Sequence, residues 1–163
     1  MELILQIPIL FNPLNSKLEL LPAIAYMHHK GEDWYLGEKE KISHDYDKVS
    51  VRLPIEVSKE ILNLAKSFDI STFCRIDTRV KNFKDFEIDT ITLDNLYFIE
   101  INPTPTIHNT INFANAINEL NKSDSHYGAF NLYKKHVKDY TVTGYILTSA
   151  IFAIKAKHSQ WQD

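Results

Sequence analysis

Two stretches of the chain alternate between apolar and polar residues with a period of two, and both fall within residues 71–106. This period predicts half-buried β-strands. In the first stretch, residues 73–80, one face carries three charged side chains: Arg75, Asp77 and Arg79. In the second, residues 96–103, one face carries an aromatic and two polar side chains: Phe98, Glu100 and Asn102. The two strands can pair with their polar faces on the same side of the sheet.

Such pairing makes Asp77, Glu100 and Asn102 three neighbouring oxygen ligands. Hard divalent cations such as Mg²⁺ take carboxylate and amide oxygens and leave the remaining positions to water and phosphate. Arg75 would lie beside them, where a guanidinium suits a phosphate or a developing oxyanion. An antiparallel hairpin whose outer face is simply charged has the same alternation. Residues 103–105, Pro-Thr-Pro, favour the metal site, because two prolines fix the loop that follows the polar side chains.

The apolar pattern elsewhere predicts strands first and helices afterwards. Residues 2–11 are rich in Ile and Leu and indicate a buried strand, with residues 18–27 returning as its antiparallel hairpin partner. Residues 54–68 predict a helix, because apolar side chains recur at helical spacing behind a proline suited to the first turn. Beyond residue 105 amphipathic segments predict further helices. Residues 144–154 are nearly apolar all round, at a length that fits a buried helix rather than a membrane span.

These elements predict an α+β fold, with an antiparallel sheet and helices packed on one side. At 163 residues the chain forms one domain, residues 1–163, and can bury a sizeable core. Its net charge of −3 gives no general attraction to nucleic acid or to an anionic membrane. The single cysteine excludes an internal disulfide framework, and the start lacks the basic region of a signal peptide. We therefore expect a cytoplasmic protein.

Arg75-Ile76-Asp77, followed by Glu100-Ile101-Asn102-Pro103-Thr104-Pro105, resembles the C-terminal half of the ATP-grasp superfamily, nearest to its D-alanine–D-alanine ligase-like members. The helix before the first strand and the long insert between the strands also fit. The resemblance implies that Asp77, Glu100 and Asn102 bind Mg²⁺ (or Mn²⁺) ions against the phosphates of ATP. It also implies that Arg75 is catalytic and contacts the acyl phosphate or the tetrahedral intermediate.

The activity implied by the resemblance is ATP- and Mg²⁺-dependent ligation of a small carboxylate to an amine. In that chemistry the carboxylate attacks the γ-phosphate to give an acyl phosphate, and the amine then displaces phosphate. The resemblance further implies that Lys41, at the end of an aromatic and acidic run, reaches the ATP phosphates as a cofactor-binding residue. A solvated run of charges explains the same residues.

The sequence also departs from the family pattern. Family members carry a glycine after the second proline of the loop, where this chain has Thr106. The glycine-rich phosphate loop and the adenine-clamping strand have no visible equivalents, so the chain is expected to begin inside the nucleotide-binding domain. The alternative function is therefore a non-catalytic, degenerate or split ATP-grasp module that acts in nucleotide binding or protein interaction.

In a complete family member, a preceding domain would cover the sheet that starts at Glu2. An uncovered apolar surface and an unpaired strand both favour association with another chain. The expectation is a homo-oligomer, or a complex with a partner chain, through the N-terminal hairpin.

Overall fold

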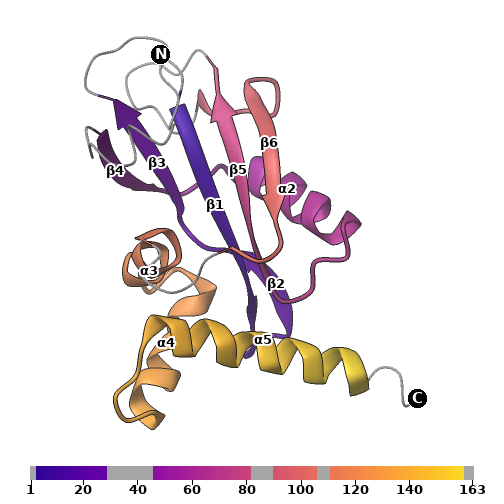
Figure 1. Ribbon diagram of the computed structural model, residues 1–163, viewed down its shortest axis with the longest axis vertical. Helices are drawn as coiled ribbons and strands as arrows, with labels where there is room; N and C mark the ends of the chain where they lie inside the picture. Colours follow the sequence, from indigo (N-terminus) through magenta and orange to yellow (C-terminus); the bar gives the residue numbers. More distant parts are fainter. Residues whose placement is uncertain (1–2, 29–45, 82–89, 106–110, 160–163) are drawn as a thin grey trace.

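The structure is a computed structural model that describes residues 3–28, 46–81, 90–105 and 111–159 (Figure 1). Its strands are β1 (Leu3–Asn12), β2 (Lys17–Leu20), β3 (Ala23–His28), β4 (Tyr46–Val51), β5 (Phe73–Val80) and β6 (Leu96–Asn102). Its helices are α2 (Ile55–Ser67), α3 (Ile111–Asn118), α4 (Ser125–His136) and α5 (Val142–Ser159). Strands thus dominate the first part of the chain and helices the last, as the apolar pattern predicts.

The strands form one open sheet in the order β4-β3-β1-β5-β6, and every neighbouring pair is antiparallel. The short strand β2 pairs with the far end of β1, from Ile9 to Asn12. The α+β class and the antiparallel sheet are confirmed. The outermost strands along this order are β4 and β6 (Figure 1).

Strand β1 lies at the centre of this sheet. All ten of its residues are buried, and it pairs with β5 along one edge and with β3 and β2 along the other. The sequence predicts one continuous partner over residues 18–27, but the structure divides this partner at Leu21 and Pro22. Pro22 cannot donate a backbone hydrogen bond, and Leu21 N donates instead to the carbonyl of Pro8 at 2.9 Å.

Helix α2 packs on one face of the sheet. Three of its residues are buried at helical spacing, Val57, Ile61 and Ala65, and they join the core cluster that holds Leu5 and Ile7 of β1. Pro54 occupies the N-cap position. Backbone N–H groups at the start of a helix have no partner within the helix, so the N–H that proline lacks is not missed there. The predicted helix is confirmed, and so is its role as a covering layer.

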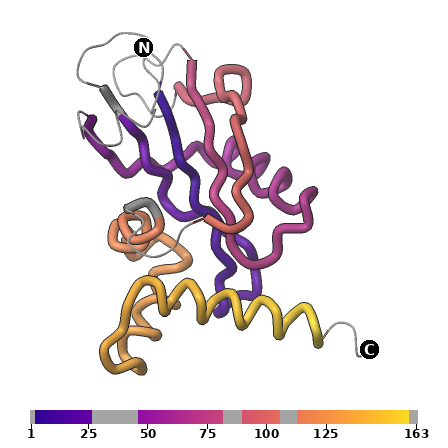
Figure 2. The backbone as a smooth tube through the Cα atoms, in the orientation of Figure 1, coloured from indigo at the N-terminus to yellow at the C-terminus, as the bar shows by residue number. Residues whose placement is uncertain are grey.

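The three C-terminal helices gather around the lower end of β1 (Figure 2). The side chain of Leu10 points to the opposite face of the sheet from that of Ile9. There it packs with Phe113 of α3, Phe130 of α4 and Tyr145 of α5 in a second core cluster. Within the described residues, no helix has the length and apolar character needed to cross a membrane.

Helix α5 is less buried than its apolar sequence predicts. One stripe lies inward and contains Tyr145, Ile146, Ser149, Ala150 and Ala153. Leu147, Ile151 and Phe152 lie outward, each about half exposed. The prediction of a buried helix over residues 144–154 is therefore wrong for half of its circumference, because β1, α3 and α4 all cover α5 from the same side.

The premise of association through the N-terminal hairpin is also corrected. Strand β1 has a neighbour on each edge, and its apolar side chains are covered by α2 and by the C-terminal helices of the same chain. It therefore presents neither an unpaired backbone nor an uncovered apolar face. The hairpin interface itself stays a prediction without this support.

We expect the central strand to dominate the stability of the fold. Ile7 has no exposed surface, so Ile7→Ala removes buried methyl groups and should lower the free energy of unfolding by about 2–5 kcal/mol. Ile55 is 73% exposed, and the matched variant Ile55→Ala should change it by about 0.5 kcal/mol or less. Urea denaturation measures both. Equal losses in the two variants would contradict the central role of β1.

Candidate functional site

Strands β5 and β6 bring the predicted polar residues to one face of the sheet. Asp77 lies directly opposite Glu100, and Arg75 lies directly opposite Asn102. Directly opposite residues of an antiparallel pair project to the same side. The sharing of a face by Asp77, Glu100 and Asn102 is therefore confirmed, as is the position of Arg75 among them.

A β-bulge changes the second half of this pairing. The register shifts between Asp77 and Thr78, so that Thr78 faces Phe98 and Ile99 is the extra residue. Phe98 consequently lies on the α2 side of the sheet, where it lines a cavity with Leu64. The predicted grouping of Phe98 with Glu100 is wrong, because a strict period of two does not survive a bulge.

Arg75 forms a two-pronged ion pair with Asp77 at the centre of this face. Its Nε donates to one carboxylate oxygen at 2.6 Å and its Nη2 to the other at 2.7 Å. The same Nη2 lies 3.8 Å from a carboxylate oxygen of Glu100. Arg75 and Asp77 are mostly buried, whereas the Glu100 side chain is 57% exposed. Two carboxylates therefore share one guanidinium, with the more accessible one at the sheet edge.

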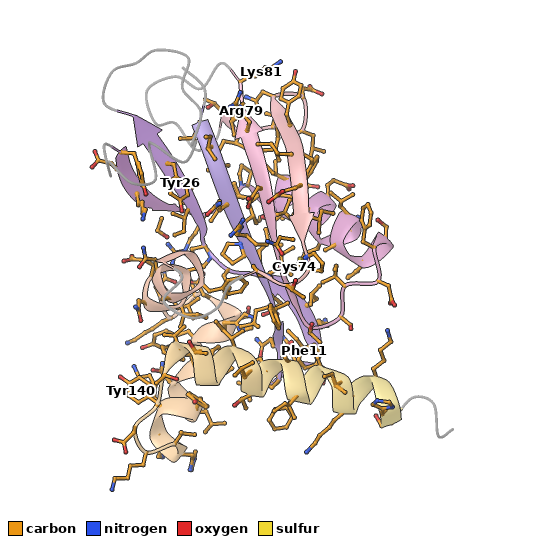
Figure 3. The ribbon with its side chains drawn as sticks, in the orientation of Figure 1. Phe11, Tyr26, Cys74, Arg79, Lys81 and Tyr140 are labelled. Carbon is orange, nitrogen blue, oxygen red and sulfur yellow. The ribbon has the colours of Figure 1, made fainter. Side chains whose placement is uncertain are left out.

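The polar contacts continue across the sheet from β5 to β3. Gln6 of β1 donates from Nε2 to Asp77 at 3.3 Å, and the Tyr26 hydroxyl donates to Oε1 of Gln6 at 2.9 Å. Gln6 is buried within an otherwise apolar strand, so this pairing satisfies an amide that would be costly to bury alone. Figure 3 labels Tyr26 on β3 and Arg79 on β5. Sequence reasoning missed Gln6 and Tyr26, although Gln6 interrupts the apolar run.

The oxygen atoms on this face are of the types that a hard divalent cation takes, although both oxygens of Asp77 already accept from Arg75. This face offers two carboxylates and an amide oxygen, and Asn102 Oδ1 accepts from Thr104 N at 3.1 Å but keeps a second lone pair. In the part of the chain that the structure describes, no group of three His, Cys, Asp or Glu side chains could hold a metal ion. The face described here has two such side chains, Asp77 and Glu100, and its third oxygen comes from an asparagine. Lys41 lies outside the described residues.

A second buried polar cluster surrounds His126 of α4. Its Nε2 lies 3.1 Å from the carbonyl oxygen of Leu10, and its Nδ1 lies 2.8 Å from the Tyr145 hydroxyl. A carbonyl oxygen can only accept, so Nε2 carries the proton and Nδ1 accepts from the hydroxyl. Nε2 is also 3.7 Å from the carboxylate of Glu19. Both nitrogens of the neutral imidazole ring are thus hydrogen-bonded.

The electrostatics of this cluster hold His126 neutral. Burial lowers its pKa and outweighs the nearby carboxylate of Glu19, which raises it. Burial also raises the pKa of Glu19, but hydrogen bonds from Ser125, Asn12 and Asn15 outweigh it, and the net pKa is lowered. Sequence reasoning missed this cluster, because its members come from four separate segments.

Cys74 is a core residue rather than a nucleophile. It is fully buried on the α2 side of β5, and burial raises the pKa of its thiol to about 12.

A scan against protein-family models and a search of curated proteins both find no match to this chain. The ATP-grasp resemblance of residues 75–77 and 100–105 stays a prediction.

We expect His126 to make the fold less stable in mild acid. Its folded-state pKa lies below the ordinary value of 6.5, so the unfolded chain binds a proton that the folded chain refuses. The free energy of unfolding should therefore fall as pH is lowered from about 7.5 to about 5.5. Glu19 does not contribute in this pH range. Its pKa is lowered from the ordinary value of 4.5 in the folded chain, so the stability that its carboxylate provides is lost only when the pH falls below about 4.5.

The variant His126→Gln should flatten this slope, and His136→Gln, at an exposed position of the same helix, should leave it unchanged. Urea unfolding at a series of pH values measures both. An unchanged slope in His126→Gln would contradict the assignment.

Proposed function

We propose that the face formed by Asp77, Glu100 and Asn102 binds a Mg²⁺–nucleotide, as the metal- and ATP-binding part of a carboxylate–amine ligase. The observation that carries the proposal is the register of β5 and β6, which sets Asp77 opposite Glu100 and Arg75 opposite Asn102. Two carboxylates, an amide and a guanidinium on one face match the needs of a metal-bound phosphate. The resemblance of the same residues to the ATP-grasp pattern supports the proposal independently of geometry.

Each residue has a distinct role in this proposal. Asp77, Glu100 and Asn102 would hold the ion, which when bound neutralises phosphate charge. Arg75 would stabilise negative charge that develops on the phosphate or on the carbonyl under attack. Ligation through an acyl phosphate needs no protein nucleophile. This agrees with the buried, hydrogen-bonded His126 and the buried thiol of Cys74.

The ion pair between Arg75 and Asp77 sets a condition on metal binding. Both carboxylate oxygens of Asp77 accept from the guanidinium, so an ion at this carboxylate competes with Arg75. Glu100 is exposed and lies at the longer distance from Arg75, so its carboxylate would be the ligand most accessible to a cation. Arg75, displaced from Asp77, would then be free to pair with a phosphate group, because the planar guanidinium binds carboxylate and phosphate in the same two-pronged geometry.

The same ion pair favours a second candidate function. A mostly buried ion pair between Arg75 and Asp77 can serve the structure alone, without any part in catalysis. The contacts therefore also fit a non-catalytic module that acts in nucleotide binding or protein interaction. Release of phosphate from Mg²⁺–ATP that is stimulated by an added amino acid separates the two. Nucleotide binding without such release favours the module.

We expect Glu100→Gln to weaken divalent cation binding roughly tenfold or more, because it removes a formal charge from the ligand set. Titration of Mn²⁺ followed by electron paramagnetic resonance measures the free ion directly. Glu60→Gln, at an exposed position of α2, is the matched control and should bind Mn²⁺ as the unaltered chain does. Equal Mn²⁺ affinities of the two variants would contradict the proposed metal site, and with it the ligase function.

Arg75→Gln tests the competition between cation and guanidinium. Without Arg75 the carboxylate of Asp77 is free for the metal, so Mn²⁺ alone should bind several-fold more tightly while Mg²⁺–ATP binds more weakly. The variant should also lose about 1–3 kcal/mol of unfolding free energy, because a mostly buried carboxylate loses its partner. A purely structural ion pair predicts the loss of stability without either change in binding.

A further inference from the structure

The polar face does not end at Tyr26 but continues onto the edge strand β4. Tyr26 lies opposite Lys48, and Ile24 lies opposite Ser50, so Lys48 and Ser50 project to the same side as Gln6 and Asp77. Helix α3 passes close to this corner of the sheet (Figure 1). Between them lies a cavity of about 400 Å³ lined by described residues of both elements: Ile24, Lys48, Val49, Ser50, Asn115 and Glu119.

Lys48 is held in place by aromatic rings rather than by an acid. Its ammonium nitrogen lies 5.2 Å from the ring centre of Tyr46 and 5.7 Å from that of Tyr26. No carboxylate of the described residues forms an ion pair with it. Partial burial lowers its pKa, which is the cost of holding a cation there without an anion. Tyr26 is itself fixed by its hydrogen bond to Gln6.

Ser50 adds a second unsatisfied group to the same cavity. Its hydroxyl oxygen is buried and has no hydrogen-bond partner within the described structure. Buried hydroxyls are normally paired, and an orphan in a polar cavity indicates a missing acceptor or donor. The ammonium of Lys48 and the hydroxyl of Ser50, two positions apart on one face of β4, together suit a carboxylate.

The opposite wall of the cavity carries negative charge. Glu119 follows the last residue of α3, and its backbone carbonyl accepts from Arg52 Nη2 at 2.9 Å, so among the described lining residues the negative charge of this wall comes from the Glu119 carboxylate alone. Lys48 and Glu119 line one cavity, yet no ion pair joins them at 4.0 Å or less among the described contacts. A ligand with both charges would bridge them.

We propose that this cavity binds a small zwitterion of the amino-acid class, with its carboxylate on Lys48 and Ser50 and its ammonium on Glu119. The volume lies within the range of small-molecule sites. The site is separate from the proposed metal face, because β4 and β5 are three strand spacings apart, about 14 Å. It therefore does not depend on metal or nucleotide binding.

Titration of the ¹⁵N-labelled full chain with L-alanine tests the proposal, with acetate and methylamine as single-charge probes. We expect alanine to shift the backbone amides of residues 48–50 and 115–119 and to bind more tightly than either probe. Lys48→Met should weaken alanine binding roughly tenfold or more, since one charge-assisted contact is lost. Lys48→Arg should restore part of it. Glu119→Gln should weaken alanine binding and leave acetate binding unchanged.

Lys122→Met removes an exposed lysine outside the cavity and is the matched control. Three results overturn the proposal: no shifts at the cavity, acetate binding as tightly as alanine, or equal affinities for Lys48→Met and Lys122→Met. Each folded variant is also titrated with Mn²⁺. Unchanged Mn²⁺ binding in Lys48→Met keeps a failure here distinct from a failure of the metal site.

Discussion

The enclosure of β1 is the constraint on which the rest of the structure depends. A strand buried on both faces needs a partner at each edge and a covering layer on each side, and this chain supplies all of them. α2 covers the odd-numbered side chains of β1, and the C-terminal helices cover Leu10. The upper part of the other face lies outside both of these core clusters; there Gln6 replaces an apolar residue, and the polar network begins among side chains that are themselves buried. The position of the candidate site therefore follows from how the core is covered.

The spacing of apolar and polar residues along the sequence was sufficient to predict several elements of this fold. The period of two in residues 73–80 gave the correct face for Arg75 and Asp77, and the helical spacing after Pro54 gave α2. These elements were predictable because each repeats its pattern over several residues and no neighbour overrides it. The fold class followed from their order along the chain.

The failures have physical causes that a single sequence does not display. Phe98 was assigned to the wrong face because one bulged residue inverts every side chain beyond it. α5 was assigned to the interior because composition does not say from how many directions a helix is covered. The contacts of His126 with Leu10 and Tyr145 join residues 116 and 19 positions apart, and that proximity is a product of packing. The pairing of Gln6 with Asp77 is likewise a matter of register.

The pairing of β1 with β5 has a consequence for how the chain acquires its fold. Leu3 lies opposite Val80, so the central ladder joins residues separated by most of the first half of the chain. Closing so long a loop costs entropy before the contacts reward it, and folds dominated by such pairings form slowly. During synthesis the first strand emerges well before β5, and among the described strands its partners made first are β2 and β3. A nascent chain of this sequence therefore carries its most apolar strand without its β5 partner until residue 80 has been made, and one backbone edge of that strand is open to association in the interval.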